Sequence, residues 1–154
     1  MDEVTAAGGR GVFVTRHGVW TTARSRPFER VSRESGHVDV LVNNAALIHE
    51  DMLKPESDSG RKPSISPTSS TSGSVGHYVA THHAIPLMVG RDNGLIVNVS
   101  FYGGARMHDP AYYACARRLD AFAATAAADL ATVRPAIVSL WPGIVSTERV
   151  MGFR

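Results

Sequence analysis

The sequence predicts an α/β fold in which a doubly wound parallel sheet of about four strands is flanked by helices. Three apolar runs rich in β-branched residues, 38–44, 94–100 and 136–141, indicate buried strands. A long alanine-rich segment separates the last two, and strands that alternate with helices are typical of a parallel sheet with right-handed crossovers. The near-continuous apolar character of residues 38–44 predicts that both faces of the sheet are covered.

The N-terminal region has a weaker pattern. The glycine-rich residues 8–11 predict a turn, and the Val-Phe-Val-Thr run at 12–15 predicts a short buried strand after it. Residues 22–34 are mostly polar with a modest apolar stripe, which predicts an amphipathic helix. Pro27 fits this helix in its first turn, and Gly36 is a suitable residue to end it.

Two further helices and one loop complete the predicted order. Residues 111–132 carry alanines and larger apolar residues at helical spacing, which predicts a long, well-packed helix. Residues 77–89 are a second helix candidate in which Pro86 either kinks the helix or lies near its end. Residues 55–74 are rich in serine and proline with Ile65 as their single large apolar residue, which predicts a flexible loop.

Length and composition bound the class of protein. The 154 residues suit a single domain, and 44% hydrophobic with 19% charged residues suits a globular core. The net charge is +2 and the arginines are scattered, so no nucleic-acid partner is expected. No apolar run approaches the roughly 18 residues of a membrane span, and the acidic start lacks a signal-peptide pattern. Cys115 is the single cysteine, so we expect a cytoplasmic protein without disulfide, metal site or membrane anchor.

Each predicted strand ends in a cluster of polar or turn residues. These clusters are Asn-Asn-Ala-Ala at 43–46, Ser-Phe-Tyr-Gly-Gly at 100–104 and Pro-Gly-Ile-Val-Ser-Thr at 142–147. Taken singly, each is explained by ordinary turn chemistry. Because the carboxyl ends of parallel strands meet at one edge, where ligands bind in such sheets, we expect the clusters to meet. Tyr112 starts the long helix, so a hydroxyl and a phenol are predicted to converge there.

These segments together resemble the short-chain dehydrogenase/reductase family. The segments that match the family are residues 38–46, 94–100, 112–130 and 138–148. The resemblance implies a Rossmann-type fold, NAD or NADP as cofactor, and hydride transfer with a small carbonyl or alcohol substrate.

The match is partial at both ends of the family's fold. Residues 5–11 precede a predicted strand instead of opening a helix, so they do not match the family's glycine-rich phosphate loop. We therefore expect 1–154 to form a single partial NAD(P)-binding domain that lacks the N-terminal glycine-rich unit and the C-terminal end.

The resemblance implies catalytic roles for two residues. Ser100 matches the serine that hydrogen-bonds the substrate oxygen, and Tyr112 matches the tyrosine that serves as general acid and base. A phenol has an ordinary pKa of about 10, and the family lowers it with a lysine one helical turn later. That position here is Ala116; the alternative register takes Tyr113 as the tyrosine and puts Arg117 in the place of the lysine. We favour Tyr112, because the later residues of the helix then match the family's pattern.

The resemblance also implies a set of residues that border the cofactor. Three follow the strand at 38–44 and three follow the strand at 136–141. They are Asn43, Asn44, Ala45, Pro142, Gly143 and Thr147.

The missing lysine and the missing phosphate loop leave two interpretations of function. The first is an NAD(P)-dependent oxidoreductase of the family whose activity is impaired in this chain. The second is a non-catalytic remnant or dimerising interaction module of the same fold. In either case a homo-oligomer is predicted to use the helices at 77–89 and 111–132, which the family uses for such contacts.

The predicted strand at 12–15 lacks the strands that would lie between it and the strand at 38–43 in the family's sheet. In the family's sheet order the strand matched by residues 12–15 does not neighbour the strand matched by 38–43. We therefore expect either that these two segments pair directly here or that the apolar edge at 38–43 stays exposed.

Overall fold

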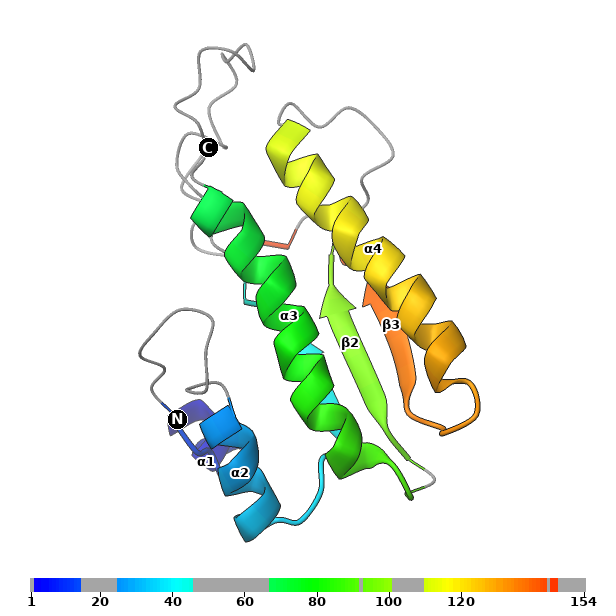
Figure 1. Ribbon diagram of the computed structural model, residues 1–154. Helices are drawn as coiled ribbons and strands as arrows, with labels where there is room; N and C mark the ends of the chain where they lie inside the picture. The colour runs from blue at the N-terminus through cyan, green and yellow to red at the C-terminus, as the bar shows by residue number, and fades with distance from the viewer. Residues whose placement is uncertain are drawn as a thin grey trace.

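The computed structural model describes residues 2–14, 25–45, 67–91, 93–100, 110–143 and 145–146 (Figure 1). Helices and strands alternate through most of the chain, as the sequence predicts. The elements in order are α1 (Asp2–Ala6), α2 (Ser25–Glu34), β1 (Val40–Asn43), α3 (Pro67–Met88), β2 (Leu95–Val99), α4 (Pro110–Leu130) and β3 (Ala136–Leu140).

The three strands form one parallel sheet in the order β1-β2-β3. Asn43 lies opposite Asn98 in the first pair, and Ile96 lies opposite Ile137 in the second. Both crossovers run in the same direction across the sheet, so right-handed connections place α3 and α4 on the same face (Figure 1). The prediction of an α/β fold with a parallel sheet and flanking helices is confirmed.

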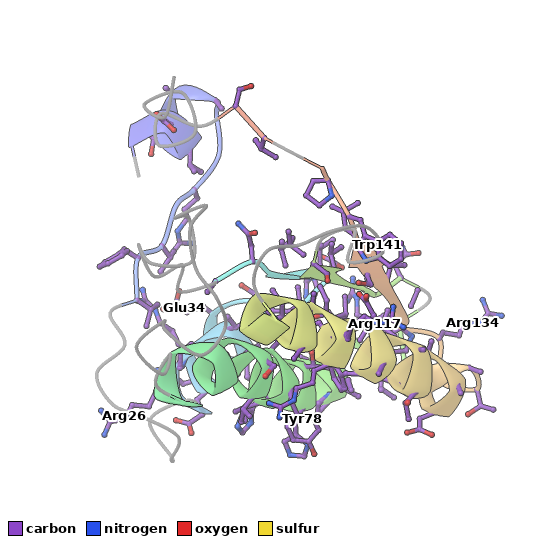
Figure 2. All side chains as sticks on the ribbon, turned by 90° about the horizontal axis from the view of Figure 1, so that it is seen from above. Arg26, Glu34, Tyr78, Arg117, Arg134 and Trp141 are labelled. Atoms are coloured by element: carbon purple, nitrogen blue, oxygen red, sulfur yellow. The ribbon has the colours of Figure 1, made fainter. Side chains whose placement is uncertain are left out.

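The core lies between this pair of helices and the sheet. α3 contacts β1 and α4, and α4 contacts β3, while α2 packs on α3. Figure 2 shows α3 and α4 side by side on one side of the sheet, with Tyr78 directed away from it. The buried apolar side chains come from all of these layers: Ala84, Met88, Ile96, Ala123, Leu130 and Ile137.

The two faces of the sheet differ sharply in burial. We call the face toward α3 and α4 the covered face; it carries Leu41, Asn43, Ile96, Asn98, Ile137 and Ser139. We call the opposite face the open face; its side chains include Val40, Val42, Val138 and Leu140, which are 55%, 57%, 44% and 49% exposed. The prediction that both faces are covered is therefore wrong for the part of the chain that the structure describes.

The predicted strand at 12–15 does not form in its described part. Residues 11–14 have no regular structure, and the Phe13 side chain is 72% exposed, while residue 15 lies outside the described residues. A short strand is stable only when a neighbour completes its hydrogen-bond ladder, and β1 pairs with β2 alone among the described strands. Of the two expected outcomes, the exposed edge is the one that the described residues show. The predicted turn before this segment is confirmed, with Gly8 at a φ of 81°.

The helix predicted at 22–34 is confirmed from Ser25 onward. Pro27 and Gly36 lie in its first turn and just after its end, as expected. Pro27 lies in the first turn of α2, where its missing N–H costs no helical hydrogen bond. Gly36 ends the helix with a φ of 75°, a conformation that side chains with a Cβ rarely adopt, and its N–H donates to the Val31 carbonyl.

Helix α3 is longer than predicted. It begins at Pro67, so the prediction of a flexible loop over 55–74 is wrong for residues 67–74, and residues 55–66 lie outside the described part. Proline is favourable at the first position of a helix, because that N–H has no helical partner. Packing of the later turns against β1 and α4 then extends the helix through a serine-rich stretch of weak propensity. Pro86 lies in the last turn, as one of the two expectations had it.

Two kinds of feature are absent from the described residues. None of the described helices has the length and apolarity needed to span a bilayer. Within the same residues, no group of three or more histidine, cysteine, aspartate or glutamate side chains is placed to bind a metal ion.

Candidate functional site

Buried amides lock the carboxyl ends of β1 and β2 together. Asn43 Nδ2 donates hydrogen bonds to Asn98 Oδ1 at 2.9 Å and to Thr81 Oγ1 at 3.2 Å. Asn43 is 5% exposed and Asn98 is fully buried. Buried polar groups are costly unless they are paired, so these bonds fix two strands and α3 in one arrangement. Asn43 therefore lies at the carboxyl end of β1, where the sequence predicts the end of a strand.

His77 extends this polar layer beyond the end of β1. Its Nε2 lies 3.1 Å from the Ala45 carbonyl oxygen, and its side chain is buried in α3. Burial lowers the pKa of His77 below its ordinary value, and the hydrogen bond to Ala45 opposes that shift in part. The imidazole is therefore neutral near pH 7 and acts as a hydrogen-bond donor to the backbone. Sequence reasoning missed this residue; its spacing of one helical turn from Thr81 is the only signal, and it is a weak one.

Ser100 lies directly after the central strand. Its backbone N–H donates to the Leu140 carbonyl at 2.9 Å, which ties it to the end of β3. The residue is 8% exposed, and its Oγ has no hydrogen-bond partner among the described residues. A buried hydroxyl without a partner is uncommon in proteins. It can donate to an oxygen atom of a ligand at this edge of the sheet.

Helix α4 carries both candidate tyrosines in its first turn. The structure describes only the backbone of Tyr112 and Tyr113. Ala116, which the favoured register puts in the place of the family's lysine, is 4% exposed and belongs to the stripe of α4 that packs into the fold. Arg117 is 60% exposed at its side chain and lies 3.9 Å from Asp120, on the side of α4 near β3 (Figure 2).

The carboxyl end of β3 is anchored by one carboxylate. Asp120 Oδ1 accepts hydrogen bonds from Ser139 Oγ at 2.5 Å and from Trp141 Nε1 at 3.0 Å. These bonds fix the direction in which the chain leaves β3. Sequence reasoning missed them, because they connect α4 with a strand about twenty residues away.

The predicted turn follows this anchor. Gly143 has a φ of 72°, and no atom lies within 4 Å of the place where a Cβ would stand. The backbone there is open to close approach by a ligand. Pro142 is exposed beside it, whereas Thr147 lies outside the described residues.

The described residues fit one end of a nicotinamide dinucleotide and not its phosphates. An unpartnered hydroxyl, an open glycine turn and two strand ends meet at the carboxyl edge, which suits a small polar group such as the nicotinamide. A phosphate cradle needs free backbone N–H groups at a glycine-rich turn that opens a helix. Gly8 and Gly9 instead follow α1, and their N–H groups already donate to the Thr5 and Val4 carbonyls.

The chain is similar to known short-chain dehydrogenases over almost its whole length. The family model described as short chain dehydrogenase matches residues 4–154. Dehydrogenase/reductase SDR family member 1 of Mus musculus is 36% identical over 155 residues, covering 98% of this chain and 50% of the relative. The protein of the same name in Homo sapiens is 36% identical over 125 residues, covering 79% of this chain and 40% of the relative. The chain thus spans about half the length of these curated relatives.

Solved structures share the fold. A putative short-chain dehydrogenase/reductase from Burkholderia xenovorans superposes with a TM-score of 0.79 at 20% identity, covering 96% of this chain and 58% of the other. A metagenomic short-chain oxidoreductase in complex with NADP superposes with a TM-score of 0.74 at 23% identity, covering 96% of this chain and 66% of the other. At these identities the likeness concerns the fold.

Proposed function

Because the chain belongs to the short-chain dehydrogenase family, we propose that it carries the substrate half of an NAD(P)-dependent oxidoreductase site for small carbonyls or alcohols. The observation that carries the proposal is the Ser100 hydroxyl, which is buried at the carboxyl end of the central strand without a described partner. We further propose that turnover by this chain is low, because Ala116 replaces the cation that activates the tyrosine.

Ser100 is proposed to orient the substrate. A hydroxyl that donates to a carbonyl oxygen stabilises the negative charge that develops there during reduction. The low polarity around a buried group strengthens such a bond relative to water. The bonds from Asn43 to Asn98 and Thr81 and the backbone bond from Ser100 to Leu140 hold the end of β2, and with it the backbone of Ser100, in place.

Tyr112 is proposed to give a proton to the substrate oxygen and to take it back in the reverse reaction. The helix period supports this register: position 112 precedes Ala116 by one turn and Leu119 by two, and both of those residues are buried. Position 113 instead leads to Arg117 and Asp120, on the side of α4 near β3. Without a cation on its stripe, the phenol is a weak base near pH 7.

The cofactor is proposed to bind by its nicotinamide end. When bound, the nicotinamide would supply or accept the hydride. The residues proposed to hold it are those that follow β1 and β3: Asn43, Asn44, Ala45, Pro142, Gly143 and Thr147. Since the described residues contain no phosphate cradle, we expect binding to be weak.

The first test measures cofactor binding. Purified protein is titrated with NADPH and NADH, and nicotinamide fluorescence reports the Kd. A saturable Kd in the high micromolar range or below supports the proposal, and Gly143→Val, which fills the open turn, should weaken it about tenfold. Absence of saturable binding by the folded protein to either nucleotide would overturn it.

The second test restores the missing cation. Ala116→Lys should raise ketone reduction at least about tenfold if Tyr112 is the acid, because general acid–base catalysis contributes roughly 10²–10⁴-fold. Arg117→Lys should do so if Tyr113 is the acid. Ala124→Lys, at an exposed position of the same helix, is the matched control. The gain must disappear when the tyrosine of that register is changed to phenylalanine or when Ser100 is changed to alanine.

The second candidate function is a non-catalytic interaction module, and one observation favours it. The open face of the sheet and the free edge of β1 are apolar and exposed among the described residues. Exposed apolar surface of this kind often marks a binding surface. A homo-oligomer through the outer sides of α3 and α4 belongs to this proposal. A stable dimer in light scattering, combined with no binding of NADPH or NADH, would favour the module over the enzyme.

A further inference from the structure

We propose that His77 is a positioning residue: its Nε2–H holds the Ala45 carbonyl and thereby fixes the backbone of Asn44 and Ala45 at the carboxyl end of β1. The consequence for cofactor binding rests on the proposed function, because that function places the nicotinamide against these residues. The hydrogen bond itself and its effect on the backbone do not depend on the cofactor.

The hydrogen bond determines the tautomer of the imidazole. A carbonyl oxygen only accepts, so the proton must lie on Nε2, which is 3.1 Å from Ala45 O. Burial disfavours the charged form and lowers the pKa of His77. Nδ1 is therefore an unprotonated nitrogen, and it is buried without a hydrogen-bond partner among the described residues. The ring is a neutral donor with one defined orientation.

Among the described residues, no strand pairing supports the backbone that His77 contacts. The ladder between β1 and β2 ends at the pair Asn43 and Asn98, so it does not reach Asn44 or Ala45. Both of these residues are exposed. A backbone segment that leaves a sheet keeps a single conformation only if other groups bind its carbonyls and N–H groups. His77 supplies such a bond from α3, across 32 residues of sequence.

The helix that carries His77 is well placed for this role. One turn later, Thr81 accepts from Asn43, so the same face of α3 holds both the last residue of β1 and the backbone beyond it. Thr81 is 2% exposed and His77 is 6% exposed, so both side chains approach β1 from the buried side of α3. The two contacts act on consecutive parts of one chain segment.

Three variants separate the donor function from simple packing. His77→Gln keeps an amide N–H at a reach similar to that of Nε2 and cannot titrate. His77→Leu keeps apolar volume and removes the donor. His82→Leu lies on the exposed side of the same helix and is the matched control.

The first measurement uses the wild-type protein alone. Its ¹⁵N spectrum should show the His77 imidazole as the Nε2-protonated, neutral tautomer at pH 7. The Nδ1-protonated tautomer or a rapidly averaging mixture would overturn the proposal. This measurement requires neither a variant nor a cofactor, so it can overturn the proposal even if His77→Leu fails to fold.

The second measurement is amide hydrogen exchange over residues 43–46, expressed relative to the amides of β2. The net worth of one hydrogen bond predicts exchange about fivefold to tenfold faster in His77→Leu. His77→Gln and His82→Leu should remain within about twofold of the wild type. Equal acceleration of the β2 amides, or no rescue by glutamine, would show a packing role and overturn the proposal.

The third measurement connects the residue to cofactor binding. In a background with measurable turnover, such as Ala116→Lys, His77→Leu should raise the KM or Kd for NADPH about fivefold to tenfold and leave kcat nearly unchanged. An effect on kcat alone would contradict the positioning role. If the wild type binds no NADPH, the proposed function fails, while the tautomer and exchange results still decide the role of His77.

Discussion

The two faces of the sheet are formed by the same strands but differ in burial. On the covered face, Ile96 is fully buried and Ile137 is 7% exposed beneath α3 and α4. On the open face, Val42 of β1 and Val138 of β3 are about half exposed, although Val138 directly follows the buried Ile137. Polarity does not explain this difference, because the covered face also contains the buried amides of Asn43 and Asn98. The direction of the crossovers decides which face is buried.

The polar residues of β1 and β2 lie on the covered face of the sheet. Asn43 is buried with its amide bonded to Asn98 and Thr81, and Asn98 is buried with its Oδ1 bonded to Asn43. The Nδ2 of Asn98 has no partner among the described residues. The valines, which have no polar group, lie toward solvent. A hydrogen bond between two buried amides specifies the relative position of two strands more strictly than apolar packing. The covered face thus combines the core with the support of the candidate site.

Removal of core volume should show the largest difference between the faces. Ile96→Ala should lower the free energy of unfolding by about 2–5 kcal/mol, because it leaves a cavity beneath α3 and α4. Val138→Ala, on the open face of the neighbouring strand, should cost well under half as much, since solvent already reaches that side chain. Urea denaturation followed by circular dichroism measures both. Similar costs for the two variants would show that the open face is covered in solution.

The amide network should show the next largest effect. Asn43→Ala leaves Asn98 Oδ1 and Thr81 Oγ1 without their described donor, which should cost about 1–3 kcal/mol of stability. Asn44→Ala, at the exposed next position, should stay within about 0.5 kcal/mol of the wild type. Thermal unfolding compares the two variants. A neutral Asn43→Ala would mean that the network does not hold the strand ends.

The pH dependence of stability should report the buried imidazole on the covered side. The pKa of His77 is lowered in the folded protein from an unfolded value of 6.5, so the unfolded chain binds more protons below that pH. Its contribution is complete above pH 6.5 and is lost as pH falls from there through the folded pKa. The melting temperature between pH 7.5 and 5 should therefore fall less steeply in His77→Gln than in the wild type.

No charged group contributes to the lowered pKa of His77, so the pH dependence reports its burial. Burial lowers the pKa of His77 and the Ala45 hydrogen bond opposes that change in part. Apart from His77, the titratable or charged side chains described on α2, α3 and α4 and on the residue before β1 are these: Arg26, Glu29, Arg30, Arg33, Glu34, Asp39, Tyr78, His82, His83, Arg117, Arg118, Asp120 and Asp129. His82→Gln is the control, because its side chain is exposed. An equal flattening of the pH profile in that variant would contradict the assignment to His77.

Polar substitution on the open face should have the smallest effect on stability. Val42→Thr keeps the shape and β-propensity of the side chain, and its hydroxyl points to a face that is already exposed. The free energy of unfolding should change by less than about 0.5 kcal/mol. Self-association in light scattering should decrease, because the apolar surface becomes smaller. A large loss of stability with unchanged association would show that another part of the protein packs on this face.

Sequence reasoning reached much of the fold and part of the site. The strands β1, β2 and β3 and the helix α4 were predictable, because long apolar or alanine-rich runs carry strong periodic signals. The early start of α3 was not, because its serine-rich first turns depend on Pro67 and on packing of the later turns. Ser100 and Asn43 could be located from strand ends. His77 could not, because its partner Ala45 lies 32 residues away and a single histidine in a helix has no distinctive pattern.

By itself the sequence determined the alternation of strands and helices, the family resemblance and the absence of a lysine one turn after Tyr112. These are local properties of composition and spacing, which a chain carries whether or not it is folded. Only the tertiary structure decided which face of each strand is buried, which hydroxyl lacks a partner and which histidine holds the backbone beyond β1. Such outcomes depend on the direction of the crossovers and on contacts between distant segments, and neither is encoded in any short stretch of residues.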